Sequence, residues 1–178
     1  ICLNKAPETS CRNHCNSLPE YKSENGRAVF RGQIAPDGPS ASRIRNWKAE
    51  LDTEHGTLVS YTVNGREMIC SPLLPNFTRG ITENDLGPDM DKAQEIWRFA
   101  QLKVADFAVE EAEDCHIVKV AYESIAGAGL VSMTYRIYAD GVIEGCEKLS
   151  DAGKLADAAP LPRFGMEFAM PGQFSNLD

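Results

Sequence analysis

Hydrophobic and polar residues alternate along most of this chain, and a period of two is typical of β-strands that bury one face. In the segment NWKAELD, for example, Trp47, Ala49 and Leu51 share one face. Asn64 and Gly65 predict a tight hairpin turn, because a type I′ turn needs positive φ at both central positions. Strands are expected at residues 27–34, 46–52, 57–63, 66–70, 106–112, 116–124, 130–139, 142–150 and 162–170.

The period changes in DMDKAQEIWRFAQL, residues 89–102, where apolar residues fall at helical spacing from Ala93 to Ala100. Asp91 is a candidate N-cap, with Gln94 three residues later, so one helix of about three turns is expected. Many strands, local hairpins and one short helix predict an all-β fold, an antiparallel β-sandwich.

The N-terminal part, residues 1–26, has no such period and is expected to be a tail or the end of a preceding domain. Residues 27–178 form the expected β-sandwich domain. The first residue is Ile1 rather than Met, which favours a chain cut from a longer protein.

One long stretch, SPLLPNFTRGITENDLGPD at residues 71–89, fits neither pattern and is expected to be a loop. Loops of this length are usually functional or disordered, so an ordered loop here is a candidate functional site. Near its end, Glu83 and Asp85 flank Asn84; binding of a sugar hydroxyl, binding of a cation and capping of backbone amides all stay open for them. Four hydrophobic residues in this loop are candidates for burial: Leu73, Leu74, Phe77 and Ile81.

The composition of the chain limits the classes of binding partner that are expected. The 178 residues carry a formal net charge of −8, which argues against nucleic acid and against an anionic membrane surface. No apolar run approaches the roughly 20 residues needed to span a bilayer. Neither nucleic acid nor a membrane is therefore expected as a partner.

The six cysteines form two groups. Three lie near His14 in the N-terminal segment, and zinc ligation, a disulfide or free thiols stay open there, because the spacing lacks a second ligand pair. These are Cys2, Cys11 and Cys15. The other three are expected to be small buried hydrophobes in separate strands: Cys70, Cys115 and Cys146.

No nucleophile elbow, phosphate-binding loop or His-Glu-x-x-His motif occurs. The acidic run at residues 110–114 lies at a strand end and is expected to be solvated. Trp47 is expected in the core, and Trp97 in the core or at an interface.

The long loop carries a resemblance to a known family. SPLLPNFTRGITENDLG resembles the motif P-x-x-x-N-F-x-R-x-x-T-x-N-D-x-G in the last, small-chain domain of glycoside hydrolase family two β-galactosidases. The preceding WKAELDTEHGTLVSYTVNGREMICSPL and the following AQEIWRFAQL match the family's order of strands and a Trp-containing helix. MTYRIYADGVI and LPRFGMEFAMPGQF resemble its later strands. Thr78 stands where the family usually has Trp, and Ile81 stands where it has Pro, so contacts of that Trp and Pro are not carried over.

The resemblance implies a galactose-mutarotase-like β-supersandwich that is not itself catalytic. In the family a separate (β/α)8 barrel supplies two glutamates for a retaining mechanism, and the last domain leans over the barrel mouth. The implied partners are that barrel and galactosides. No cofactor is expected in this fragment, although the parent enzyme is expected to use a divalent cation. A family segment, W-x-G-x-G-P-x-E, would begin just after PGQFSNLD, so the domain is expected to be truncated on its C-terminal side.

The resemblance also implies roles for six residues of the loop. Phe77 would pack inward, as would Ile81. The others would hold the loop by hydrogen bonds and ion pairing near the face that meets the barrel, and direct sugar contact is left open. These residues are Asn76, Arg79, Asn84 and Asp85.

Two alternative functions stay open. An aldose 1-epimerase would need a general acid and a carboxylate base, for which His116 with Glu167 or Glu123 are the candidates. A stand-alone carbohydrate-binding module would need exposed aromatic side chains. The natural sugar also stays open, because family two includes glucuronidases and mannosidases, and so does the compartment, cytoplasmic or periplasmic.

Overall fold

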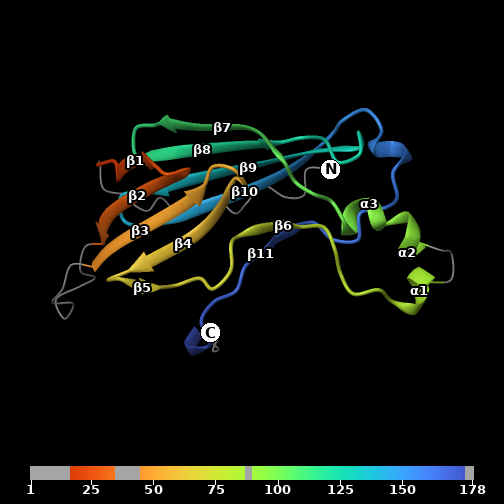
Figure 1. The fold of residues 1–178 in the computed structure, drawn as a ribbon, viewed down its shortest axis with the longest axis horizontal. Coiled ribbons are helices and arrows are strands. Elements are labelled where there is room, and N and C mark those ends of the chain that lie inside the picture. The colour runs from red at the N-terminus through yellow and green to blue at the C-terminus, as the bar shows by residue number, and fades with distance from the viewer. Residues whose placement is uncertain (1–16, 35–44, 87–89, 175–178) are drawn as a thin grey trace.

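Two antiparallel β-sheets and a small third sheet make up the fold in the computed structural model, which describes residues 17–34, 45–86 and 90–174 (Figure 1). The five-stranded sheet has the order β1-β2-β3-β4-β5, and its strands are Glu20–Glu24, Arg27–Ile34, Arg45–Asp52, Thr57–Val63 and Arg66–Glu67. The four-stranded sheet has the order β10-β9-β8-β7, with β7 to β10 at Val104–Glu111, Cys115–Tyr122, Gly129–Tyr138 and Ile143–Asp151. The third sheet pairs β6, Leu74–Asn76, with β11, Gly165–Glu167. The predicted antiparallel all-β fold is confirmed.

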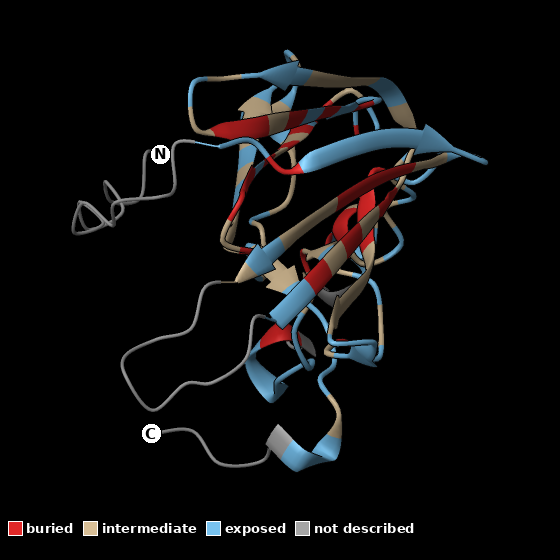
Figure 2. Ribbon diagram, turned by 90° about the vertical axis from the view of Figure 1, so that its left-hand side faces the viewer, coloured by how far each residue is buried: buried red, intermediate tan, exposed pale blue. Residues whose placement is uncertain are grey.

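One hydrophobic cluster joins the two large sheets. It combines inward residues of β2 and β3 with those of β8 and β9, and Figure 2 shows buried positions alternating with exposed ones along the strands. Trp47 of β3 lies in this core as predicted, and its indole N–H donates to the Ala139 carbonyl at 2.9 Å. The Tyr61 hydroxyl donates to the Gly141 carbonyl at 2.8 Å. These two bonds tie the five-stranded sheet to the β9–β10 hairpin.

The predicted hairpin turn at Asn64 and Gly65 is present, and a second hairpin turn joins β9 to β10. Asn64 and Gly65 have φ of 51° and 76°, as a type I′ turn between β4 and β5 requires. Gly141 has φ of 85° in the turn that joins β9 to β10. In both turns, residues with positive φ lie where the chain reverses direction.

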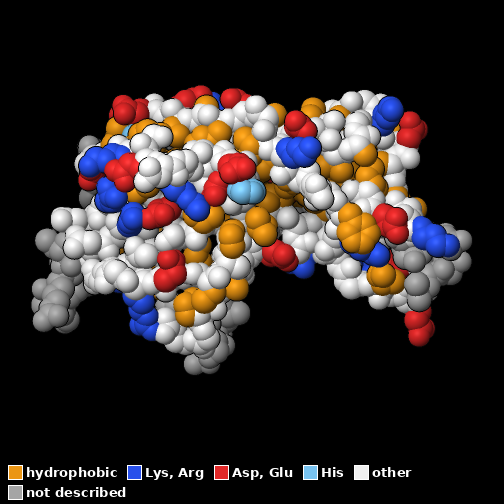
Figure 3. Space-filling model, viewed as in Figure 1, with side chains coloured by type: hydrophobic (Ala, Val, Ile, Leu, Met, Phe, Trp, Pro, Cys, Tyr) orange, Lys and Arg blue, Asp and Glu red, His pale blue; other side chains and the backbone are white. Residues whose placement is uncertain are grey.

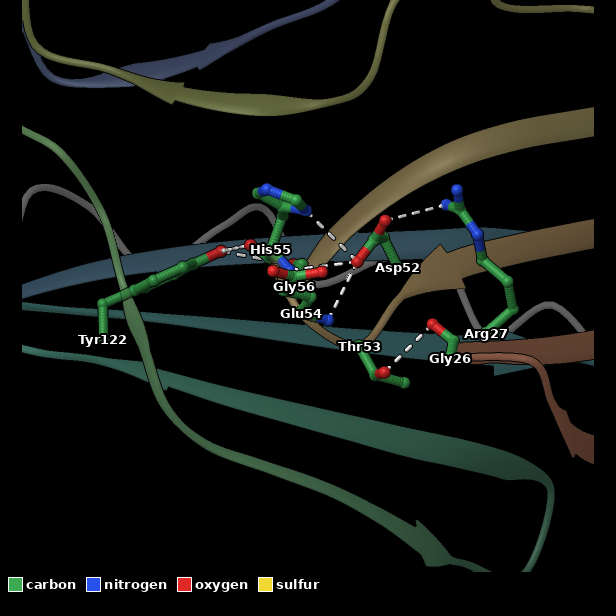
Figure 4. A network of polar contacts seen from close by, with 8 residues as sticks. All are labelled: Gly26, Arg27, Asp52, Thr53, Glu54, His55, Gly56 and Tyr122. Atoms are coloured by element: carbon green, nitrogen blue, oxygen red, sulfur yellow. Dashed lines mark hydrogen bonds and ion pairs between the residues drawn. The ribbon is translucent and has the colours of Figure 1, made fainter.

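A further turn, between β3 and β4, is held by a polar network (Figure 4). The Asp52 carboxylate accepts the backbone N–H of His55 at 3.0 Å and pairs with the Arg27 guanidinium at 3.1 Å. Gly56 ends the turn with φ of 69°, and its carbonyl accepts the Tyr122 hydroxyl at 3.2 Å. The turn thereby connects the two large sheets at this end of the sandwich.

The end of the N-terminal segment joins the five-stranded sheet. Residues 20–24 form β1, which pairs in register with β2. Tyr21 on β1 stacks on Phe30 at a ring-centroid distance of 5.0 Å. The cluster of Cys2, Cys11, Cys15 and His14 lies outside the described residues. The domain boundary near residue 26 stays a prediction.

The helical segment is more broken than predicted. Instead of one helix over residues 89–102, there are two single turns, α2 at Met90–Ala93 and α3 at Glu95–Arg98. A further turn, α1 at Glu83–Leu86, precedes them. Gln94 separates α2 from α3 and makes no side-chain capping bond. Trp97 is buried, and its indole N–H donates to the Ala159 carbonyl at 2.8 Å. This hydrogen bond joins α3 to the segment that follows β10. No helix within the described ranges is long and apolar enough to cross a membrane.

The strand cysteines are only partly as expected. Cys115 is buried, but Cys70 and Cys146 are exposed, so burial was wrong for these two. Cys146 pairs across from Thr134 at an outward position of β10, while Cys70 lies in a bend after β5. Alternation places Cys146 on the solvent side of β10, whereas Cys70 lies outside a strand and alternation does not apply to it.

Candidate functional site

The candidate site is the loop from residue 71 to residue 86, called the 71–86 loop below. It leaves the end of the five-stranded sheet, contributes β6 to the small sheet and ends in α1 (Figure 1). It therefore lies beside β11 and the helical turns rather than between the two large sheets. Six of its residues and Glu167 of β11 make the contacts that define its shape.

An ion pair closes the second half of the loop. Both Arg79 nitrogens donate to the Asp85 carboxylate, each at 2.8 Å, in the bidentate geometry that is the strongest form of this pair. The same carboxylate accepts the backbone N–H and the hydroxyl of Thr82, both at 2.8 Å. The Arg79 guanidinium and the Thr82 donors hold the pKa of Asp85 well below its usual range. The expected ion pairing is present, and the carboxylate accepts four hydrogen bonds from its own loop.

Asn76 fixes the first half of the loop. Its Oδ1 accepts the Thr78 backbone N–H at 2.8 Å, and its Nδ2 donates to the Glu167 carboxylate on β11. The sequence did not indicate Glu167 as a partner of this loop, because 91 residues separate it from Asn76. Asn84 and Glu83 are exposed in α1.

Phe77 anchors the loop to the core as expected. It is 4% exposed, and its ring lies 6.4 Å from the Trp97 ring and 6.3 Å from the Phe164 ring, between centroids. The same expectation for Ile81 is wrong, because this side chain is 47% exposed. The next residue, Thr82, donates to the buried Asp85 carboxylate, while the Ile81 side chain faces solvent.

The outer side of this region exposes apolar groups among polar ones. Figure 3 shows hydrophobic side chains at the surface between charged ones at the end of the molecule that carries the helical turns. Large exposed hydrophobic residues on the loop, on the helical segment and around β11 are Leu74, Ile81, Phe99, Phe164, Phe168 and Met170. An apolar groove of about 440 Å³ lies nearby, lined by Tyr61, Ile69, Leu73 and Phe168 among others.

The candidate catalytic histidine lies elsewhere and is enclosed. His116 is 2% exposed, its Nε2 lies 3.0 Å from the Pro19 carbonyl, and Tyr21 and Phe30 flank its ring. A buried imidazole covered by β1 has no surface for a sugar. Across the described parts of the chain, no group of three or more His, Cys, Asp or Glu residues could hold a metal ion.

Comparison with known proteins assigns the chain to a family. A family described as "Beta galactosidase small chain" matches residues 43–178. The chain belongs to the β-galactosidase small-chain family. The chain is 29% identical over 134 residues to a β-galactosidase of Priestia megaterium, covering 74% of this chain and 13% of the relative.

Two further relatives are also β-galactosidases. The enzyme of Streptococcus thermophilus is 32% identical over 138 residues, covering 75% of this chain and 13% of the relative. That of Clostridium acetobutylicum is 26% identical over 165 residues, covering 91% of this chain and 18% of the relative. The small-chain domain thus spans less than a fifth of these enzymes, and their other domains lie outside the matched part.

One chemically unusual residue of this small-chain domain escaped the motif search. Glu147 of β10 is a carboxylate enclosed by protein, and both its oxygens lack a hydrogen-bond partner among the described residues. A signal for it was available, because Glu147 has the same strand parity as Ile143 and Leu149, which pack against the core.

Proposed function

We propose that this chain is a non-catalytic accessory domain of a β-galactosidase, and that its 71–86 loop helps to shape the sugar site of the parent enzyme. One observation carries the proposal: the loop is fixed from within by the Arg79–Asp85 ion pair while its outer edge faces solvent. Ordering a loop costs about 1–2 kcal/mol of backbone entropy per residue, and the internal contacts offset that cost. A loop held in this way presents a fixed surface to a partner.

The outer edge of the loop has a composition suited to a sugar. The Asn84 side chain offers both an amide donor and a carbonyl acceptor for a hydroxyl group, and Ile81 offers an apolar surface. The proposed partner is the catalytic barrel of the parent chain, and the proposed substrates of the whole enzyme are terminal β-galactosides. Because Asp85 is fully engaged and His116 is enclosed, the isolated domain is expected to be inactive, and no cofactor is expected in it.

The first test uses the isolated chain and a chromogenic galactoside. No turnover above the buffer rate is expected. Clear hydrolysis that is lost on changing Glu83 or Asp85 would show that this domain itself carries out catalysis, and the proposal would then be wrong.

The second test uses the full-length parent enzyme with Asn84→Ala. Loss of one hydrogen bond to the sugar corresponds to about 1 kcal/mol, so a reduction of kcat/KM of about fivefold is expected. Glu113→Ala, an exposed residue in the turn between β7 and β8, is the matched control and is expected to leave kcat/KM unchanged. Equal kcat/KM for the Asn84 variant and the control would contradict the proposed role of the loop at the sugar site.

A stand-alone carbohydrate-binding module is a second candidate, because Phe99 is 67% exposed and can stack on the apolar face of a sugar. A titration of the isolated chain with galactose or lactose separates the two. Saturable binding that Phe99→Ala abolishes would favour the module over the accessory domain.

A further inference from the structure

Glu147 lies on the wrong face of its strand for a charged residue. It pairs across from Met133 of β9, which is completely buried, so both side chains point to the inner side of the four-stranded sheet. Its neighbours of the same parity on β10, Ile143 and Leu149, pack against the hydrophobic core. Glu147 is therefore a carboxylate in a row of apolar positions.

The carboxylate is enclosed but unpartnered. Neither of its oxygens is accessible to solvent, and neither accepts a hydrogen bond from the described residues. Asp85, by contrast, accepts four bonds. Leaving water without gaining a partner penalises the ionised form strongly. Burial accordingly raises the pKa of Glu147 to about 7.

The position of Glu147 connects the sheet to the segments that carry the 71–86 loop. On one side of it along β10, Gly145 faces Met166 of β11, whose sulfur would lie 3.6 Å from a Cβ at that glycine. On the other side, Leu149 lies beside Gly129, which in turn faces the Trp97 indole. Glu147 thus lies between Gly145, which approaches β11, and Leu149, which lies beside the glycine of β9 that faces the Trp97 indole of α3.

The titratable groups that face Glu147 are neutral hydroxyls. Burial raises the pKa of Tyr122 on β8 and of Tyr135 on β9, and the Glu147 carboxylate raises both further. Within the described chain no Lys, Arg or His donates to Glu147, and burial alone accounts for the shift in its pKa.

Charged residues on the adjoining elements point elsewhere. Glu144 and Lys148 of β10 have the opposite strand parity, and Glu144 accepts the Tyr138 hydroxyl at 3.1 Å. Glu167 of β11 accepts from Asn76. On α3, Trp97 points inward to the core, and Glu95 is exposed. Nothing described on these elements compensates the charge of an ionised Glu147.

We propose that Glu147 is a proton-controlled switch between β10 and the loop-bearing segments: protonated, it permits their close packing, and ionised, it loosens it. In the unfolded chain a Glu ionises near pH 4.5, whereas in the folded chain Glu147 keeps its proton to about pH 7. Between these pH values the folded state binds more protons, so stability falls as the pH rises. The loss of stability from ionising Glu147 reaches its full size above about pH 7 and is absent below pH 4.5. This switch is independent of the sugar chemistry proposed above.

The first experiment measures protonation directly in the complete chain. Side-chain carboxyl carbons are followed by NMR from pH 4 to 9, with the Glu147 signal assigned by its loss in Glu147→Gln. A midpoint near 7 supports the switch. A midpoint near 4.5 overturns it. The titration is measured on the folded wild type, so it does not depend on the stability of a variant.

The second experiment compares urea unfolding of the wild type, Glu147→Gln and Glu123→Gln between pH 5 and pH 8.5. Glu123 is the matched control because it is exposed at the end of β8. Since Gln cannot ionise, the unfolding constant of the wild type relative to Glu147→Gln is expected to rise by about 10- to 100-fold over this range. The ratio for wild type against Glu123→Gln is expected to stay constant. A flat ratio for both variants overturns the switch.

The third experiment tests the coupling to the loop. Trypsin can cut after Arg79, and the rate at this site is compared between wild type and Glu147→Gln at each pH, so that the pH dependence of the protease cancels. The switch predicts that this ratio rises above pH 7. If unfolding depends on pH while the cleavage ratio stays constant, Glu147 affects the whole fold only, and the proposed loosening of the loop is wrong. A negative result here leaves the accessory function untouched, because no sugar takes part.

Discussion

Replacing Phe77 with Ala tests whether the 71–86 loop is truly anchored in the core. Phe77 is 4% exposed and contacts Trp97 and Phe164 across two aromatic pairs. Truncation removes the transfer free energy of the ring and leaves a cavity between those partners. For a buried Phe these two effects together amount to about 3–5 kcal/mol of unfolding free energy.

The expected loss can be measured as a shift in melting temperature. For a chain of 178 residues each kcal/mol corresponds to about 2–4 °C, so a decrease of roughly 6–20 °C is expected. Phe99→Ala is the matched control, because Phe99 is 67% exposed and its truncation is expected to change stability by less than about 0.5 kcal/mol. Differential scanning calorimetry of both variants and the wild type decides the matter.

A second readout distinguishes loss of the anchor from general destabilisation. The loop is expected to become more sensitive to trypsin after Arg79 at temperatures well below melting. If Phe77→Ala melts like Phe99→Ala, with a loss below about 1 kcal/mol, Phe77 is not an anchor and the burial argument is refuted.

Two further changes test the polar clamp and the β3–β4 turn. Asp85→Asn is expected to increase tryptic cleavage of the loop and to destabilise the chain near neutral pH, whereas Glu83→Gln, an exposed neighbour, is not. Folding lowers the pKa of Asp85, so the stabilisation from the ionised carboxylate is complete above the unfolded value of 3.8 and is lost in acid. The difference in urea midpoint between wild type and Asp85→Asn must therefore shrink as the pH falls below that value. A difference that stays constant with pH would contradict the ion pair. Gly56→Ala is expected to cost about 2–5 kcal/mol, because φ is 69° and the new Cβ would lie 2.3 Å from Val120 Cγ1. Gly65→Ala, with φ of 76° and open space around it, is expected to cost only the smaller backbone strain, and equal losses for the two would exclude the steric term.

The parts of the fold that depend on neighbouring residues could be predicted from the sequence. Alternation located the strands, and Asn64-Gly65 located a hairpin turn, because both signals act through local backbone geometry. In the loop, the family resemblance implied ion pairing, and the structure contains the Arg79–Asp85 pair. The place of the loop at a sugar site or at the interface with the barrel stays a prediction.

The parts that depend on distant contacts could not be predicted. Ile81 looked suitable for burial, but it is 47% exposed, whereas the polar Asp85 is 5% exposed. The expected single helix is divided at Gln94, and Trp97 in the second part donates to the Ala159 carbonyl after β10. Partners 62 and 91 residues away, such as Ala159 for Trp97 and Glu167 for Asn76, leave no trace in a local pattern.

The sequence by itself determined the antiparallel strands, their turns, the parity of each strand residue and membership of a β-galactosidase domain family. Only the tertiary structure decided which inward positions find partners. Glu147 illustrates the difference: parity alone places it on the inner face of β10, but its lack of a donor depends on what β8, β9, β11 and α3 bring there. Local steric and hydrogen-bonding rules act over a few residues, whereas burial and charge compensation depend on segments that only folding brings together.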